Sequence, residues 1–423
     1  MGELYDHLKT AIHNRTLLMT NAFEIETIQS HDKHRNWKGE GLSLTQTVGI
    51  IYSDAFQKYD FGPTHPLKPT RLKLTFELMR AVNLLSSSNV IVSEPRQANR
   101  EELLLFHEEE YLELVRRMSE SGEGYLDMGD TPAFKGCYEA SALGAGASLE
   151  AADLVMSGKV THAMNIAGGL HHAHRNRASG FCIFNDPAVS IAYLKRRYGV
   201  KRILYLDVDA HHGDGVMYGF YSDPSLLDID FHEDGHHLFP GTGFTDEIGE
   251  GEASGLKVNV PLSPFTDDNA YLELFRQIVP RAVRKYSPEI LLLQCGADSH
   301  ANDLLAHLQI TTTAYREIAE TVHTLAHEVA QGRLVVFGGG GYNIANVART
   351  WTIVGSVLAG FNPLDSIPES WQRLFEALVG EKAPDRLETN REATIGLSQD
   401  KTLRHSVDIL QDLKRRIPLL TQK

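Results

Sequence analysis

Cysteine is scarce in this chain of 423 residues, with three in total, Cys137, Cys182 and Cys295, placed far apart. So few cysteines exclude a framework of disulfide bonds and suit a reducing compartment, and we therefore expect a cytoplasmic protein. Long apolar runs are also missing, and none approaches the ~20 residues that a membrane-spanning helix needs. The N-terminal segment MGELYDHLKT has early acids and no apolar core. We therefore expect neither a secretory signal nor a membrane partner.

Positive charge is in short supply as well. Lys and Arg number 41 against 55 Asp and Glu, which gives a formal net charge of −14 at pH 7. Proteins that bind nucleic acid non-specifically neutralise its phosphates with Lys and Arg, so we expect no direct nucleic-acid binding. The charge favours cationic partners instead, such as basic protein tails or polyamines. No pattern in the sequence indicates an oligomeric state.

Strand-like apolar runs alternate with helical patterns over most of the chain. Such alternation is typical of an α/β fold with a single open, mostly parallel sheet and helices on both faces. The expected strands are Val48–Tyr52, Val90–Val92, Ala163–Ile166, Ile203–Val208, Leu226–Phe231, Leu256–Val260, Ile290–Gln294 and Leu334–Phe337. The expected helices are Pro69–Leu85, Glu101–Glu120, Gly136–Ser157, Pro187–Arg197, Asp267–Tyr286, Thr312–Ala330 and Asn346–Gly360.

The same patterns predict how the chain is divided. We expect an N-terminal extension at residues 1–46, with an amphipathic helix over His7–Met19, and one main domain at residues 47–360. After Gly360 the chain turns polar, and we expect residues 361–423 to form a helical extension that packs on this domain. Its expected elements are helices at Ile367–Val379 and Gln399–Ile417, with a loop at Lys382–Leu397.

The segment DVDAHHGDG at 207–215 follows one of the expected strands. It brings three acids and two histidines to the end of a buried strand, where a metal ion is the usual compensation for burying charge. Asp209 and His211 are two residues apart, so their side chains point to the same side of an extended chain. One carboxylate and one imidazole are two of the three protein ligands of a catalytic zinc site. A helix N-cap followed by solvated histidines would not account for all five groups.

Two adjacent histidines, His171 and His172, follow the glycines of GGLHHA at 168–173. We expect them on a turn where both rings enter one cavity, either as metal ligands or as proton-transfer groups. A histidine acts as a base near neutral pH, and a carboxylate on its far nitrogen fixes the tautomer and raises its basicity. Asp207 and Asp214 are left over once Asp209 is assigned to a metal, so the sequence suggests two Asp–His dyads.

Two further expected strands end in glycine turns that carry functional groups, QCGAD at 294–298 and GGGGYN at 338–343. Four glycines cost backbone entropy and need a reason, but neither a following Lys-Ser/Thr nor a dinucleotide fingerprint supports a phosphate cradle. We interpret them as a close backbone approach to a ligand that places the hydroxyl of Tyr342. Asp298 supplies another acid at the end of a strand.

Polar groups at the carboxyl ends of parallel strands meet in one crevice. Two carboxylates and one imidazole would surround a zinc ion with an open position for water, while two histidines and a tyrosine would surround the reacting group. This arrangement predicts a metal hydrolase. The ligands would be Asp209, His211 and Asp298, and the reacting groups His171, His172 and Tyr342.

Seven motifs in this order resemble those of the zinc-dependent histone deacetylase family in the arginase–deacetylase superfamily. The likeness is strongest to its class I-like bacterial branch, which includes the acetoin-utilisation deacetylases. It covers roughly residues 47–360, which it implies to be the catalytic domain of an arginase/deacetylase-like three-layer fold. The motifs are HPLKPTR at 65–71, GGLHHA, SGFCIFND at 179–186, DVDAHHGDG, FPGTG at 239–243, QCGAD and GGGGYN.

The resemblance implies an enzyme that hydrolyses the amide of N-acetyl-lysine in an acetylated protein or peptide. It implies zinc on Asp209, His211 and Asp298, and it gives Tyr342 the role of donor to the developing oxyanion. In the dyads, His172 with Asp214 resembles the general base, and His171 with Asp207 the second, mainly electrostatic histidine. Substrate contacts are implied for Gly180, Phe181, Phe239 and, at the rim, Leu305.

A monovalent cation such as K⁺ is also implied by the family, with Asp207, Asp209, His211, Asp230 and Phe231 at the matching positions. Asp230 departs from the pattern, because many relatives place a hydroxyl residue there. The rim acid that grips the substrate backbone is not evident, and Glu123 and Asp127 are candidates. Three alternatives remain: an acetylpolyamine deacetylase, an inactive reader or scaffold, and an arginase-like enzyme with two metal ions.

Overall fold

A computed structural model describes residues 47–389 and 397–421 of the chain. These residues fall within one compact unit. The N-terminal extension at 1–46, with the helix expected at His7–Met19, lies outside the described residues, as do residues 390–396 of the expected C-terminal loop. No helix in the described ranges is long and apolar enough to cross a membrane.

Eight strands form a single sheet in the order β2-β1-β3-β8-β7-β4-β5-β6, and every pair of neighbours is parallel. The strands are β1 Val48–Ile51, β2 Val90–Ser93, β3 His162–Asn165, β4 Ile203–Asp207, β5 Leu226–Glu233, β6 Lys257–Leu262, β7 Ile290–Gln294 and β8 Leu334–Phe337. All residues of the central strands β3, β8, β7 and β4 are buried, as is typical of a parallel sheet covered on both faces.

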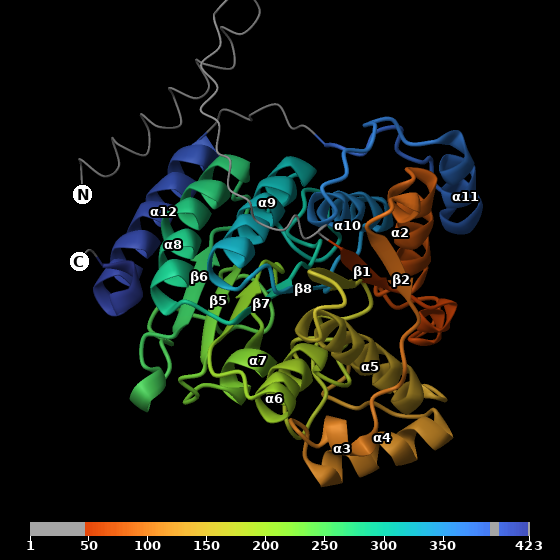
Figure 1. Ribbon diagram of the computed structural model, residues 1–423, viewed down its shortest axis with the longest axis horizontal. Helices are drawn as coiled ribbons and strands as arrows, with labels where there is room; N and C mark the ends of the chain where they lie inside the picture. The colour runs from red at the N-terminus through yellow and green to blue at the C-terminus, as the bar shows by residue number, and fades with distance from the viewer. Residues whose placement is uncertain (1–46, 390–396, 422–423) are drawn as a thin grey trace, which may run out of the picture. The chain divides into compact units, whose positions relative to one another are not determined.

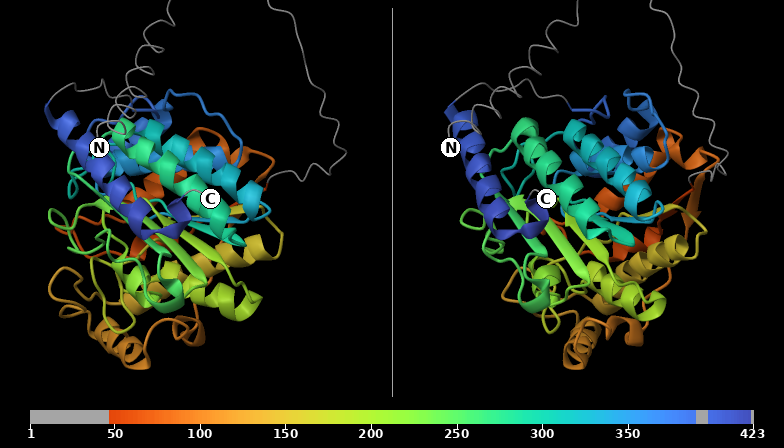
Figure 2. Two further views of the ribbon diagram at one scale, coloured as in Figure 1. Left: turned by 90° about the vertical axis from the view of Figure 1, so that its left-hand side faces the viewer. Right: turned by 60° about the vertical axis from the view of Figure 1, so that its left-hand side comes forward.

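Helices cover both faces of the sheet (Figures 1 and 2). One layer holds α2 Thr70–Ala81, α8 Asp268–Tyr286, α9 Thr312–Val329, α10 Ile344–Leu358 and α12 Leu397–Arg416, and the other holds α5 Cys137–Met156 and α6 Asp186–Tyr198. The expected α/β fold with one open parallel sheet is therefore confirmed. The remaining helices are α3 Arg100–Leu103, α4 Glu109–Ser121, α7 Asp214–Gly219 and α11 Glu369–Val379, with short 3-10 turns at Asp54–Lys58, Leu84–Ser86, Gly251–Ala253 and Pro418–Leu420.

The two C-terminal helices contact the rest of the unit through specific hydrogen bonds. In α11 the indole of Trp371 is buried and donates to the carbonyl of Leu74 in α2, at 2.8 Å. In α12 the carboxylate of Asp412 accepts from the hydroxyl of Thr245 at 2.6 Å. Both helices thus lie against the part of the chain in which the sequence motifs occur.

The prediction of one continuous helix over Glu101–Glu120 is wrong. The pattern over Glu101–Glu120 predicts one helix, but the structure has α3 and α4 with a break between Leu103 and Glu109. The break buries His107, whose Nδ1 lies 3.0 Å from the carbonyl oxygen of His174 and whose Nε2 accepts from the amide of Asn185 at 3.0 Å. Tertiary hydrogen bonds to distant loops therefore override a helical pattern here.

Candidate active site

The four sequence motifs with ionisable groups follow four strands that are neighbours in the sheet, β3, β8, β7 and β4. Because all strands are parallel, the motifs leave the sheet at the same edge. A narrow pocket lies there. It is lined by Leu67, Arg71, Gly169, Leu170, His171, His172, Gly180, Phe181, Cys182, Asp209, His211, Gly339, Gly340 and Tyr342.

Three side chains expected to bind a metal converge beside this pocket. Nδ1 of His211 lies 3.1 Å from Oδ1 of Asp209 and 3.0 Å from Oδ2 of Asp298. Ligand atoms of all three residues lie within 4.8 Å of one another, and all three side chains are buried. Two carboxylates and one imidazole are a ligand set that zinc accepts, with a further position open for water or substrate.

The surrounding backbone is shaped around these carboxylates. Oδ2 of Asp209 accepts from the amide of Gly340 and from the side chain of Gln294, both at 2.8 Å. A side chain at Gly340 would collide with Asp298, and one at Gly296 would collide with Asp209. Gly296 and Gly340 therefore let the backbone pass directly beside the two carboxylates.

The electrostatics of this cluster favour a bound cation. Burial and the negative charge of Asp209 together raise the pKa of Asp298 to about 7. Burial alone would lower the pKa of His211, but the two carboxylates raise it well above its usual value. A divalent ion would satisfy both carboxylates at once, so the residues fit the zinc site that the family resemblance implies.

Two histidine–carboxylate pairs stand beside these ligands. Nδ1 of His171 lies 2.7 Å from Oδ2 of Asp207, and Nδ1 of His172 lies 2.8 Å from Oδ1 of Asp214. The structure therefore contains both pairs that the sequence suggested. The two Nε2 atoms are 3.1 Å apart and lie on the far side of each ring from its carboxylate.

The two histidines differ in charge although they are adjacent in sequence. Burial works to lower the pKa of His171, but the carboxylates of Asp207 and Asp209 raise it to about 10. Burial and the positive charge of His171 lower the pKa of His172 to about 4. At neutral pH His171 is therefore charged and His172 is neutral, so only His172 can accept a proton.

Tyr342 lines the same pocket and is held from two sides. Its amide donates to Oδ2 of Asp303 at 2.8 Å, and the carbonyl of the preceding Gly341 accepts from the buried guanidinium of Arg71 at 3.0 Å. Its ring lies edge-on to Phe181, with centroids 5.9 Å apart. Burial and the nearby acids raise the pKa of the Tyr342 hydroxyl well above its usual value, so it stays a proton donor at neutral pH.

Comparison with known proteins adds an independent line of support. A family description, the histone deacetylase domain, matches residues 65–358. The acetoin utilization protein AcuC of Bacillus subtilis is 42% identical over 330 residues, covering 76% of this chain and 84% of its own length. The proteins of that name from Staphylococcus xylosus and Staphylococcus aureus (strain MSSA476) are 36% and 40% identical, covering 85% and 80% of this chain and 95% and 90% of their own lengths.

The chain belongs to the histone deacetylase family. It is therefore an amide hydrolase of the deacetylase type, and members of this family generally depend on zinc. The family assignment made from the seven motifs is thus confirmed. The roles of individual residues remain predictions, which the geometry above supports.

The aromatic residues expected to contact substrate flank the deacetylase pocket. The ring of Phe239 lies edge-on to His172, with centroids 5.0 Å apart, and 44% of Phe239 is exposed. Phe181 has a left-handed backbone with φ of 67°, and its amide donates to the hydroxyl of Thr131 at 3.0 Å. Leu305, which the family resemblance places at the rim, is half-buried and is not among the residues that line the pocket.

The residues expected at the monovalent-cation site lie on neighbouring strands, with Asp207 of β4 opposite Asp230 of β5. Asp230 accepts from the amide of Gly213 at 2.7 Å and lies 2.6 Å from Nδ1 of His232. Phe231 is buried. The carboxylate of Asp230 is thus hydrogen-bonded both to a histidine and to the backbone of the 207–215 motif.

Two residues of the deacetylase site were missed by the sequence interpretation. Their side chains form hydrogen bonds with backbone groups of another motif, and such contacts leave no pattern in the local sequence. Asp186 accepts from the amides of Gly169 and Leu170, at 3.0 and 2.9 Å. The side chain of Asn185 donates to the carbonyls of His171 and Ala173, both at 2.8 Å. Asn185 and Asp186 both belong to SGFCIFND, so the motif itself was the available signal.

Neither candidate for the rim acid stands out. Oδ1 of Asp127 accepts from the amides of Gly129, Asp130 and Thr131, at 2.9, 3.1 and 2.9 Å, which makes it a residue that holds its own loop. Glu123 is exposed.

A methyl group at Gly180 tests how closely the ring of His172 is positioned. Its Cβ would lie 2.5 Å from Cδ2 of His172 and 2.9 Å from Phe239, and Gly180 has a φ of 53°. We expect Gly180→Ala to lower kcat/KM by about tenfold to a hundredfold with zinc retained, because small displacements of a catalytic group are costly. Gly199→Ala is the control, since Gly199 has a φ of 66° and open space around its Cβ. Equal kinetics in the two variants would contradict the close fit.

Proposed function

We propose that this deacetylase hydrolyses the amide of N-acetyl-lysine in a protein or peptide, with zinc held by Asp209, His211 and Asp298. The observation that carries the proposal is the convergence of three kinds of group. A zinc-type ligand set, a neutral histidine beside a charged one, and a tyrosine hydroxyl all border one narrow pocket. An inactive reader would not need this combination.

When bound, zinc lowers the pKa of its water to about 7 and polarises the amide carbonyl. The protein's own groups then handle the proton. Asp214 holds Nδ1 of His172, so Nε2 is the nitrogen that takes the proton from water and returns it to the leaving amine. Tyr342 donates to the carbonyl oxygen as its negative charge grows. The charged His171 stabilises that charge without exchanging a proton.

The pocket wall supports an acylated lysine as substrate. Phe181 and Phe239 supply the apolar surface that a thin aliphatic stem needs. An unmodified lysine would bring an ammonium group into this apolar passage and lose hydration, whereas an acetylated one is uncharged. An acetylpolyamine would meet the same walls, so it is the second candidate substrate.

Two further parts of the proposal concern the ion content and location. Asp207, Asp209, His211, Asp230 and Phe231 would hold a monovalent cation such as K⁺ next to the zinc site. All three cysteines are buried thiols without disulfide bonds, which is consistent with the cytoplasmic location that we expect.

The test is single-turnover release of acetate by the zinc-saturated protein from an acetyl-lysine peptide, compared with Tyr342→Phe. We expect the variant to react about a hundredfold to a thousandfold more slowly, because it lacks one oxyanion donor, while zinc content and substrate binding change little. An unchanged rate would mean that Tyr342 only lines the pocket. Acetylpolyamines are assayed in parallel, and a kcat/KM higher for them than for every acetyl-lysine peptide would move the substrate assignment to the small amides.

A further inference from the structure

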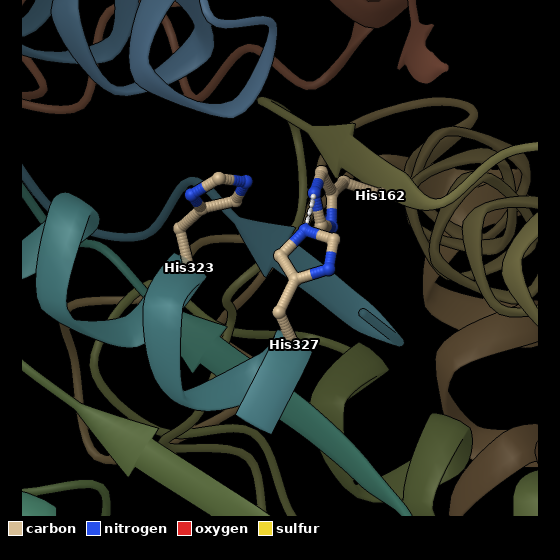
Figure 3. Close-up of side chains that lie close together, drawn as sticks. All are labelled: His162, His323 and His327. Carbon is tan, nitrogen blue, oxygen red and sulfur yellow. Dashed lines mark hydrogen bonds between the residues drawn. The ribbon is translucent and has the colours of Figure 1, made fainter. Parts of the chain in front are cut away.

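Three histidines far from the catalytic pocket meet in space. His323 and His327 lie on successive turns of α9, and His162 is the first residue of β3 (Figure 3). Since every strand is parallel and the catalytic motifs follow the strands, this group sits at the opposite edge of the sheet from the active site. None of the deacetylase motifs includes these residues.

The spacing of the ring nitrogens matches that of metal ligands. Nε2 of His162 and Nε2 of His327 are 3.3 Å apart. Two nitrogens bound to one tetrahedral zinc at 2.0–2.1 Å would be separated by about 3.4 Å. One nitrogen of each of the three rings lies within 4.8 Å of the others. Residues four apart on a helix face the same side, so α9 presents its two rings together.

Two ring nitrogens of this group, Nδ1 of His162 and Nε2 of His323, are buried and have no hydrogen-bond partner within the described residues. An unsatisfied buried nitrogen is costly, and native structures seldom contain two in one cluster. The three rings pack edge-to-face, with centroids between 4.7 and 5.1 Å apart, so no polar residue separates them.

The chemical state of the rings suits a metal ion. Burial lowers the pKa of His162 to about 3, with His323 and His327 adding to the effect, and burial lowers the pKa of the other two rings as well. All three are therefore neutral near pH 7 and offer lone pairs without first losing a proton. His327 is exposed, which leaves an entry path from solvent.

The turn after α9 passes close to the three histidines. Gly332 has a φ of 82°, and a Cβ there would lie 2.9 Å from the ring of His327 and 2.6 Å from Thr161. Glycine thus lets the chain that enters β8 pass directly beside the cluster. His162 pairs with Leu334 in the sheet, so the helix end, the turn and both strand starts meet at this point.

We propose that His162, His323 and His327 form a second metal site, which binds zinc or another imidazole-preferring transition-metal ion and joins α9 to the start of β3. Three neutral imidazoles without a carboxylate select such ions over Mg²⁺ and Ca²⁺, which prefer oxygen ligands. With water completing the coordination, the ion would be structural. The proposal is independent of the zinc assigned to catalysis.

The experiment counts zinc in the full chain. The protein is stripped with chelator, reloaded with excess Zn²⁺, desalted and analysed for metal per chain. We expect two zinc ions in the wild type and one in the double variant His323→Gln/His327→Gln, with deacetylase turnover unchanged. His237→Gln, which alters an exposed histidine elsewhere, should keep two. Equal counts in the wild type and the double variant would overturn the proposal.

Two further measurements distinguish the loss of a metal site from a defect in folding. His327→Gln alone changes an exposed ring, and we expect it to weaken zinc binding at this site by more than about tenfold in chelator competition. Zn²⁺ should raise the Tm of Asp298→Ala, in which only the histidine site is intact, and should raise it less when His323→Gln/His327→Gln is added. An equal rise in both backgrounds would again reject the site. If the zinc assigned to catalysis were absent, the wild type would bind one zinc ion and the double variant none. The difference of one zinc ion between the two proteins would remain.

Discussion

Asp298→Ala should lower the zinc content by one ion per chain and reduce turnover to background. The side chain lies 3.0 Å from His211 and supplies one of three converging ligands, so its loss leaves one carboxylate and one imidazole. Two ligands hold zinc much less tightly than three, and without the ion the site has no activated water. Metal analysis and acetate release on the same preparation measure both effects.

The fold should survive this change. Asp298 lies next to Asp209, and burial together with that neighbour raises its pKa to about 7, so its removal relieves repulsion between carboxylates. The matched control is Asp228→Asn, another buried aspartate, on β5, whose carboxylate has no hydrogen-bond partner within the described part of the chain. It should keep both zinc and turnover. Full zinc content in Asp298→Ala would refute the ligand assignment.

His172→Ala should lower turnover by about a hundredfold to ten-thousandfold while zinc stays bound, since proton transfer by one positioned group contributes that much. His172 is the neutral histidine of the pair and its Nδ1 is held by Asp214, so it alone can accept the proton of water. The measurements are single-turnover rates and zinc content. A variant that lost its zinc would show that His172 is a ligand and not the base.

Two companion variants separate the base from its neighbour. His171→Ala removes a charged ring that cannot accept a proton, so the rate should fall less than in His172→Ala. Asp214→Asn keeps the hydrogen bond to Nδ1 but changes the tautomer or lowers the basicity of the ring, and its rate should lie between the wild type and His172→Ala. A larger loss of rate in His171→Ala than in His172→Ala would mean that His171 is the base and His172 the electrostatic histidine.

The sequence alone was sufficient to locate the strands and the polar motifs that follow them. Ile290–Gln294 and Leu334–Phe337 begin and end where expected, because a short, continuously apolar run between turn residues has few other solutions. The sequence also suggested two Asp–His dyads, because Asp207 and Asp214 are left over once Asp209 is assigned to a metal, and the family resemblance implied which aspartate pairs with which histidine. The distances of 2.7 and 2.8 Å agree with that interpretation.

Helix boundaries that depend on contacts with distant residues could not be predicted from the sequence. The break between α3 and α4 exists because His107 reaches the carbonyl of His174 and the amide of Asn185. Nothing in the local pattern around Glu101–Glu120 records these partners. Residues that act on backbone, such as Asp186 beneath the GGLHHA turn, were missed for the same reason.

Sequence by itself thus determined the fold class, the family and the residue types at the site. Only the tertiary structure decided that β3, β8, β7 and β4 are neighbours, which brings together motifs that are up to about 170 positions apart and encloses them in one pocket. It also decided the opposite pKa shifts of two adjacent histidines, because the carboxylates of Asp207 and Asp209 raise the pKa of His171, whereas burial and the charge of His171 lower that of His172. The meeting of His162 with His323 and His327 has the same origin: strand order and helix packing place them together.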